Sequence, residues 1–187
     1  MLDRKRQLPI IHHREQKNLG GMFVVEKLDL EFANGARRRY ERMQSSGLGA
    51  VLIVPMLDDD TVLLIREYAC GVHQYEITLP KGRLEKGENI HEAADRELKE
   101  EAGYGARRLD TLAELTLAPG YMSHRTHIIL ARDLYPERLE GDEPEELEVI
   151  PWPMARIGEL IGRSDCTEGR TLAALFMARE KMARGEI

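Results

Sequence analysis

The stretch from Gly82 to Tyr104, GRLEKGENIHEAADRELKEEAGY, constrains the possible folds of this chain more than any other feature. Its spacing predicts a helix from about Asn89 to Ala102. Asn89 and Glu92 have the spacing of a capping box, in which each side chain accepts a hydrogen bond from the backbone of the other residue. Gly103 supplies the stop, because glycine readily adopts the left-handed conformation that ends many helices. Local signals therefore predict the start and the end of this helix.

The predicted helix crowds acidic side chains onto one patch. Glu97, Glu100 and Glu101 are neighbours on its surface, and like charges at these spacings destabilise a helix. An apolar stripe beside them would pack on a sheet: Ile90, Ala94, Leu98 and Ala102. A hard divalent cation such as Mg²⁺ would relieve the repulsion. Screening of a solvated face by Arg96 and Lys99 would also relieve it, and the charge pattern alone leaves both interpretations open.

Apolar runs on either side of this helix predict a layered α/β domain. Gly49–Pro55 and Thr61–Arg66 are almost continuously apolar, so we expect them to be buried strands of a central sheet. Further strands are expected at Gln74–Thr78, Arg108–Leu117 and Thr126–Arg132. Helical apolar spacing occurs at Met154–Ile161 and Gly169–Arg184. Trp152, which lies between two prolines, is expected to anchor packing.

The N-terminal part of the chain predicts a small antiparallel appendage. Asn34-Gly35 lies between two strand-like runs and is a strong hairpin signal, because both residues tolerate positive φ. The exposed edges of such a hairpin need a partner, either the main domain or a second subunit. We therefore expect a dimer-forming appendage at residues 1–46 and one main domain at residues 47–187. His12 and His13 are expected to lie in a flexible tail.

Net charge argues against a nucleic-acid partner. The chain has 27 Lys and Arg against 33 Asp and Glu, a formal net charge of −6, although Arg37–Arg39 form a local basic run. No stretch has the pattern of a signal peptide or a membrane span. Cys70 and Cys166 lack the spacing of a zinc site or a disulfide framework. We expect a cytoplasmic protein without nucleic-acid or membrane partners.

The glutamate-rich stretch also has a specific spacing. Gly82 is followed after five residues by Glu88, and after seven more by the sequence RELKEEAGY, which ends at Tyr104. This pattern resembles the Nudix box, G-x5-E-x7-R-E-U-x-E-E-x-G-U, in which U is a bulky aliphatic residue; Tyr104 at the last U is the one departure. The resemblance implies the Nudix fold, an α/β/α sandwich with a mixed central sheet. It also implies hydrolysis of a nucleoside diphosphate linked to another group.

The resemblance implies roles for individual residues of the box. Metal binding is implied for the carboxylates of Glu97, Glu100 and Glu101, of which Glu100 and Glu101 would thereby be catalytic, and for the backbone carbonyl of Lys81. The expected ions are Mg²⁺, with Mn²⁺ as an alternative, and two or more in each site. Structural or orienting roles are implied for Gly82, Glu85, Glu88 and Arg96. Arg96 would orient the glutamates through charge-assisted hydrogen bonds.

Hydrolysis also needs a general base and groups that neutralise the phosphates. The acidic segment 140–146 offers Glu143 and Glu145 as candidate bases, as the corresponding loop does in ADP-ribose pyrophosphatases, and Glu100 is an alternative. A solvated loop is the simpler interpretation of such a charge run. Arg66 and the Lys81 side chain are candidates for phosphate binding, or else ordinary surface charges.

Residues outside the box resemble the ADP-ribose pyrophosphatase-like branch of the family. Pro119 lies where those enzymes carry a proline that shapes the adenosine or ribose pocket, and an ordinary Pro-Gly turn is the alternative. His124-Arg125 replaces the glutamate that usually follows. Longer stretches resemble bacterial members that cleave ADP-ribose, diadenosine polyphosphates and NADH: Lys27–Phe32, Leu64–Ala69 and Asp133–Glu145.

This resemblance implies Mg²⁺-dependent hydrolysis of ADP-linked compounds, with release of AMP, by a homodimer joined through the N-terminal sheet. Aromatic side chains that would either pack in a core or stack on adenine are Phe23, Phe32 and Tyr40. Two alternatives remain: a pyrophosphatase of GDP-mannose or another sugar nucleotide, and a sensor that binds ADP-ribose or NAD without cleaving it. A sensor is expected to lose a metal-binding glutamate, and this sequence retains all of them.

Overall fold

The computed structural model describes residues 7–20, 24–45 and 48–187, so Phe23 lies outside the described residues. The chain forms two compact units. The N-terminal unit comprises residues 1–47 and 118–124, and the main unit comprises residues 48–117 and 125–187. Among the described residues, no helix is both long enough and apolar enough to cross a membrane.

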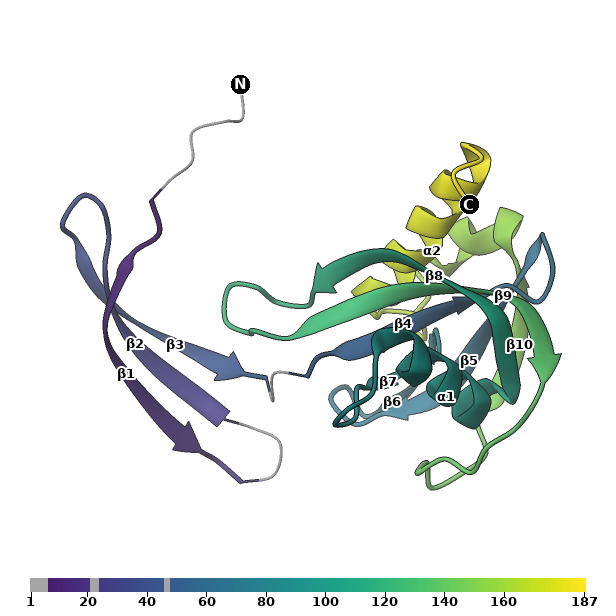
Figure 1. Cartoon of the computed structure of the whole chain (residues 1–187), viewed down its shortest axis with the longest axis horizontal. Helices are drawn as coiled ribbons and strands as arrows, with labels where there is room; N and C mark the ends of the chain where they lie inside the picture. Colours follow the sequence, from purple (N-terminus) through teal and green to yellow (C-terminus); the bar gives the residue numbers. More distant parts are fainter. Residues whose placement is uncertain (1–6, 21–23, 46–47) are drawn as a thin grey trace. The chain divides into compact units, whose positions relative to one another are not determined.

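The N-terminal unit is built on an antiparallel sheet of three strands, with the second strand in the centre (Figure 1). Its strands are β1 (Ile10–Asn18), β2 (Val24–Glu31) and β3 (Arg37–Gln44). The predicted hairpin joins β2 to β3. Gly35 in its turn has a φ of 79°, which glycine adopts without the strain that a side chain would cause.

Two expectations for the N-terminal unit were wrong. His12 and His13 lie in β1, which pairs with β2, and not in a flexible tail. The sequence did not reveal β1 because all of its residues are exposed, so it lacks the apolar alternation of a half-buried strand. Tyr40 is 47% exposed and does not form a core, although its ring centroid lies 6.2 Å from that of Phe32. Stacking of these rings on adenine stays a prediction.

Two sheets form the middle of the main unit. The larger sheet contains, in spatial order, β7 (Lys81–Arg83), β4 (Ala50–Pro55), β9 (Arg125–Pro136) and β8 (Tyr104–Thr116). Because β4 and β9 are parallel and the other pairs are antiparallel, this sheet is mixed, as predicted. The smaller sheet is antiparallel and contains, in spatial order, β10 (Glu148–Pro153), β5 (Thr61–Ala69) and β6 (Gln74–Thr78).

Helices lie on both sides of the larger sheet (Figure 1). They are α1 (Ile90–Ala102), the 3₁₀ helix η1 (Met154–Leu160) and α2 (Gly169–Ala183). Val51 and Ile53 of β4 pack in the core beneath α1, whereas Leu52 and Val54 pack in the core that contains η1 and α2. Burial on both faces explains why this strand is continuously apolar. The predicted α/β sandwich is confirmed.

Element boundaries and short strands differ from the prediction. β8 begins at Tyr104, directly after the end of α1, and not near Arg108. β7 was not predicted because it has only three residues and no apolar pattern. β10 was not predicted because it contains two prolines, which cannot donate hydrogen bonds to a neighbouring strand. β10 is accordingly an edge strand, and its Trp152 packs against the core that contains α2, as expected.

Candidate functional site

Local hydrogen bonds determine the register of α1. The Asn89 side chain accepts hydrogen bonds from the backbone N–H groups of His91 and Glu92, at 2.9 and 3.1 Å. The Glu92 carboxylate accepts one from the Asn89 N–H at 3.0 Å. Gly103 ends the helix at a φ of 75°. The capping box and the glycine stop are confirmed, and together they decide which helix residues face the sheet.

Two glutamates of α1 are buried where the helix meets β7. Glu97 is 8% exposed and Glu101 is 3% exposed, whereas Glu100 is partly exposed. The Glu101 carboxylate accepts a hydrogen bond from the Lys81 N–H of β7 at 2.7 Å. A Cβ atom at Gly82 would overlap the carboxylate of Glu97, so the glycine leaves the space that this carboxylate occupies. The strand backbone and the buried acids therefore share one tightly packed corner.

One arginine lies among these acids. Arg96 Nη1 donates to Glu97 Oε1 at 2.8 Å and to Glu100 Oε2 at 2.9 Å. Its Nε donates to Glu88 Oε1 at 2.9 Å, and its Nη2 donates to the backbone carbonyl of Arg83 at 3.1 Å. These contacts have the geometry that an orienting residue requires. The orienting role itself stays a prediction.

Burial leaves two of the carboxylates short of compensating charge. Desolvation raises the pKa of Glu101 well above its usual value, although the charge and the N–H of Lys81 oppose this effect. Desolvation also raises the pKa of Glu97 against the opposing effect of Arg96, and nearby carboxylates, Glu143 among them, raise it further. Buried acids that favour protonation in the absence of a cation are candidates for a cation site.

The donor set suits a hard divalent cation. Carboxylate and carbonyl oxygens are the ligands that Mg²⁺ takes in proteins, together with waters and substrate phosphates. Glu97, Glu100 and Glu101 offer the carboxylates, and Lys81 offers a carbonyl on the strand that contacts their helix. In the part of the chain that the structure describes, no three acidic, histidine or cysteine groups form a ready metal-binding cluster, and two of these glutamates are turned toward Arg96. These contacts use one oxygen of each carboxylate, Oε1 of Glu97 and Oε2 of Glu100, so Arg96 and an ion can be bound by different oxygens of the same side chain.

A loop between β9 and β10, residues 137–147, approaches the same helix; we call it the acidic loop. A Cβ atom at Gly141 would lie 3.4 Å from the Cβ of Glu100 and 2.5 Å from Oε2 of Glu143. The charge of Glu143 helps to raise the pKa of Glu97. Glu145, in contrast, accepts a hydrogen bond from the Tyr75 hydroxyl at 2.6 Å. The two candidate bases thus have different surroundings.

Comparison with known families divides the chain in two. Residues 48–160 match the NUDIX domain, and residues 9–42 match the NudE-type Nudix hydrolase N-terminal domain. The chain belongs to the Nudix family. Nudix hydrolases generally use a divalent metal, typically Mg²⁺, which agrees with the chemistry of the oxygen donors around β7. The predicted enzyme class, a Nudix pyrophosphohydrolase, is confirmed.

Individual relatives span nearly the whole of this Nudix chain. It is 48% identical to the ADP compounds hydrolase NudE of Escherichia coli (strain K12) over 179 residues, 96% of each chain. It is 30% identical to the ADP-ribose pyrophosphatase of Bacillus subtilis (strain 168) over 172 residues, 91% of this chain and 92% of the relative. The crystal structure of an ADP compounds hydrolase matches it with a TM-score of 0.89 and 46% identity, over 99% of this chain and 100% of the other. The predicted likeness to bacterial hydrolases of ADP-linked compounds is confirmed.

The cations predicted to bind phosphate are already paired in the Nudix domain. Arg66 donates hydrogen bonds to Glu148 at 2.8 Å and to Asp165 at 3.2 Å. The Lys81 ammonium lies 2.5 Å from a carboxylate oxygen of Glu67. The sequence did not predict that Glu67 pairs with Lys81. Alternation along β5 indicates only that Glu67 lies on the strand face opposite to Arg66. A phosphate would have to compete with these carboxylates, and the roles of both cations stay predictions.

Two further predicted residues of the Nudix chain lie in loops. Glu85 is exposed, and its backbone N–H donates to Glu88 Oε2 at 3.0 Å, so this residue helps to shape the connection between β7 and α1. Pro119 belongs to residues 118–124, which group with the N-terminal unit. The functional roles of both residues stay predictions.

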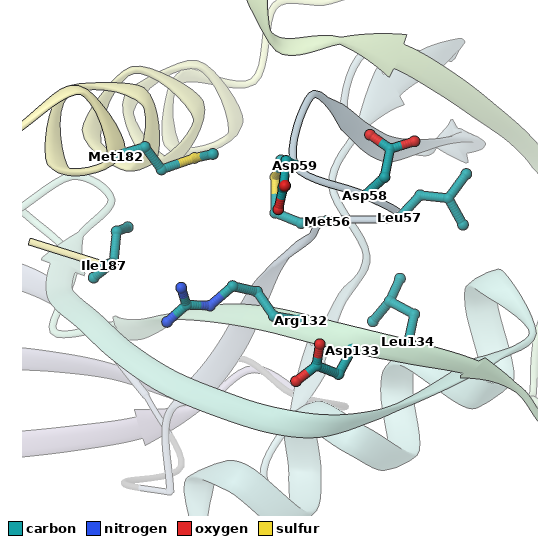
Figure 2. A pocket seen from close by; sticks show the side chains of 9 residues that line it. All are labelled: Met56, Leu57, Asp58, Asp59, Arg132, Asp133, Leu134, Met182 and Ile187. Carbon is teal, nitrogen blue, oxygen red and sulfur yellow. The ribbon is translucent and has the colours of Figure 1, made fainter. Parts of the chain in front are cut away.

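A separate pocket lies beyond the C-terminal end of β4, whereas β7 and the box glutamates lie near its N-terminal end (Figure 2). It has a volume of about 240 Å³ and is lined by the β4–β5 turn, by β9 and by the C-terminal segment. Its lining residues are Met56, Leu57, Asp58, Asp59, Arg132, Asp133, Leu134, Met182 and Ile187. β7 pairs with the start of β4, at Ala50–Leu52, whereas this pocket begins after Pro55. The pocket is therefore distinct from the glutamate site of the Nudix box, and it contains none of the predicted site residues.

Proposed function

We propose that this Nudix chain hydrolyses the pyrophosphate bond of ADP-linked compounds in a Mg²⁺-dependent reaction and releases AMP. The proposal rests chiefly on the buried pair Glu97 and Glu101, whose pKa values are raised beside the backbone of β7. Two relatives support the substrate class, since one is an ADP compounds hydrolase and another is an ADP-ribose pyrophosphatase. The expected substrates are ADP-ribose, diadenosine polyphosphates and NADH.

The metal would be held by the carboxylates of Glu97, Glu100 and Glu101 and by the Lys81 carbonyl, as two or more ions of Mg²⁺ or Mn²⁺. When bound, it would neutralise charge on the phosphate oxygens and lower the pKa of the attacking water. Arg96, which is fixed by Glu88 and the Arg83 carbonyl, restricts the rotation of the two glutamates that it contacts. Gly82 leaves room for the Glu97 carboxylate.

The proton of the attacking water passes to Glu143 in this proposal. Support comes from the electrostatic proximity of Glu143 to Glu97, whereas Glu145 is bound by Tyr75. Glu145 and Glu100 remain the alternatives for this step. Arg66 and Lys81 would exchange their present carboxylate partners for phosphate oxygens when the substrate binds.

A hydrolysis panel tests the proposed function. Purified protein is incubated with Mg²⁺ and ADP-ribose, diadenosine triphosphate, NADH or GDP-mannose, and AMP or GMP release is measured by chromatography. We expect AMP release from the ADP-linked compounds. Preference for GDP-mannose would favour the sugar-nucleotide alternative. This compound is included in the panel because a relative from Salmonella is a GDP-mannose pyrophosphatase. Binding without release from any compound would favour a sensor and contradict the enzyme proposal.

We also propose that the protein forms a homodimer through the sheet of β1, β2 and β3, which lies within the predicted appendage of residues 1–46. β1 and β3 are edge strands, and β1 exposes Ile10 (56%) and Ile11 (38%). Sedimentation equilibrium of the full chain should give twice the chain mass, and Ile10→Glu should shift the equilibrium toward the monomer. A monomeric wild type would contradict this proposal. A cytoplasmic location, without nucleic-acid partners, likewise stays a proposal from composition and charge.

A further inference from the structure

The acidic loop brings like charges together. A Cβ atom at Gly141 would lie 2.5 Å from Oε2 of Glu143 and 3.4 Å from the Cβ of Glu100, so the loop holds the Glu143 carboxylate close to a box glutamate. Without a bound cation, such an arrangement is repulsive. Specific contacts must therefore hold this loop near α1.

The acidic loop is attached near both of its ends. At its start, the Glu137 N–H donates to the Gly103 carbonyl at 3.1 Å, and the Leu139 N–H donates to the Lys99 carbonyl at 3.3 Å. Near its end, the Tyr75 hydroxyl of β6 donates to Glu145 Oε1 at 2.6 Å. A hydroxyl-to-carboxylate hydrogen bond of this length is charge-assisted and stronger than a neutral one. Glu143 lies between these two attachments.

We propose that Tyr75 is a positioning residue for hydrolysis: its hydroxyl binds Glu145 and thereby keeps Glu143 beside the box glutamates. Glu145 then acts as a tether and not as the base. The kinetic part of this inference rests on the proposed function. The structural part, that Tyr75 restrains the acidic loop, does not depend on any activity.

Tyr68 provides a matched control for Tyr75. The two residues are partners across β5 and β6, and their exposed fractions are similar, 44% for Tyr68 and 48% for Tyr75. Their rings pack edge to face with centroids 5.9 Å apart. The Tyr68 hydroxyl, however, is hydrogen-bonded to His73 Nδ1 at 2.7 Å and not to the acidic loop. Changing either tyrosine to phenylalanine keeps the ring and removes one hydroxyl.

Hydrogen exchange of the metal-free full chain tests the structural part. In Tyr75→Phe, the amides of residues 140–143, 145 and 146 should exchange about tenfold faster than in the wild type, because one charge-assisted hydrogen bond is lost. Tyr68→Phe should leave these amides unchanged, and exchange in β4 should be the same in all three proteins. Unchanged loop exchange in Tyr75→Phe, or equal acceleration in both variants, would overturn the proposal.

Steady-state kinetics with ADP-ribose and Mg²⁺ test the positioning role. Tyr75→Phe should lower kcat about tenfold with less than a twofold change in KM, and Tyr68→Phe should match the wild type. Glu145→Ala, which removes the acceptor, should lose a similar factor, and the double variant Tyr75→Phe/Glu145→Ala should lose no more than either single variant. A loss of about a hundredfold or more in Glu145→Ala alone would make Glu145 the base and overturn the proposal. If the wild type cleaves nothing in the substrate panel, the proposed function fails, and hydrogen exchange still decides whether Tyr75 restrains the loop.

Discussion

The N-terminal sheet and helix α1 are both rich in charge, but they compensate it in different ways. In the sheet, carboxylates have arginine partners on the neighbouring strand: Arg39 binds Asp29 at 2.7 and 3.0 Å, and Arg37 binds Glu31 at 2.8 Å. The hydrogen bond from Arg39 lowers the pKa of Asp29, and hydrogen bonds with His12 and then Arg37 lower the pKa of Glu31. In α1, a single arginine contacts three carboxylates, and burial raises the pKa of two glutamates.

The contrast distinguishes the paired, exposed carboxylates of the sheet from the buried carboxylates of the candidate metal site. Exposed pairs contribute little to stability and need no further partner. Buried carboxylates that outnumber the nearby cations cost stability, and we propose that a cation from solution compensates them. Composition cannot make this distinction, because both regions contain acidic and basic residues. Burial and the number of partners for each carboxylate do make it.

The largest expected effect follows from Glu101→Gln. Hydrolysis of ADP-ribose should fall by roughly a hundred- to a thousandfold, because a carboxylate that we propose as a metal ligand is lost. The Tm in chelator should rise, because the amide can still accept the hydrogen bond from the Lys81 N–H while a buried charge is removed. Asp29→Asn in the sheet should neither lower the rate of ADP-ribose hydrolysis nor raise the Tm in chelator. Full activity of Glu101→Gln would remove the distinction between the two regions.

Gly82→Ala tests the space beside Glu97. The added methyl group would overlap the Glu97 carboxylate and force it to turn, so Mg²⁺ affinity measured by calorimetry should fall about tenfold. The fold should survive, since the obstructed atoms are at the end of a flexible side chain. Gly71→Ala is the matched control, because no neighbouring atom lies within 4 Å of the position its Cβ would take. Equal Mg²⁺ affinity in both variants would show that the Glu97 position does not matter for metal binding.

Arg96→Met should lower the free energy of unfolding by about 2 kcal/mol in metal-free urea titrations, because it leaves partly buried carboxylates without their cation. Mg²⁺ should restore part of this loss. Arg39→Met in the exposed sheet should show no measurable change. A comparable loss in both variants would mean that the two kinds of charge are energetically alike.

The smallest effect is a pH dependence of the metal-free protein. A carboxyl group whose pKa is higher in the folded state than in the unfolded state holds its proton more tightly when the protein is folded. Its contribution to stability is therefore fully present below the unfolded-state pKa and is lost as pH rises through the folded-state pKa. For Glu97 and Glu101 the Tm in chelator should therefore fall as pH rises from about 5 to about 8. Asp29 and Glu31 have lowered pKa values, so their contribution is lost only on acidification. A flat profile in wild type, or an unchanged slope in Glu101→Gln, would contradict the assignment.

Much of the main unit could be predicted from local patterns. Asn89 and Gly103 gave the helix its ends, because caps are encoded within a few residues. The runs around Val51 and Val62 gave two strands, because burial on both faces requires continuous apolar sequence. Glu97, Glu100 and Glu101 could be placed on one patch from helix geometry alone. Their burial could not, since it depends on a three-residue strand that the sequence does not mark.

The unpredicted contacts join residues that are distant in the chain. Tyr75 and Glu145 are 70 residues apart, and Arg66 and Glu148 are 82 residues apart. Their partnership depends on the packing of β5, β6 and the segments around β10, for which a single sequence carries no pairing signal. β1 was missed for a different reason, since an exposed polar strand resembles a tail in composition.

The box constrains the number of residues between its fixed positions as well as the residue types at those positions. Gly82 is held in register by its pairing with Val51, and Glu97 is held by the cap at Asn89. One residue inserted within the helix before Glu97 would turn every later side chain by about 100° and swing the acids away from the strand. The same insertion in the loop before Asn89 would leave the faces of the helix unchanged, although it would displace Glu88 from its contact with Arg96 if it followed Glu88. Insertions and deletions should therefore be least tolerated within the first two turns of the helix.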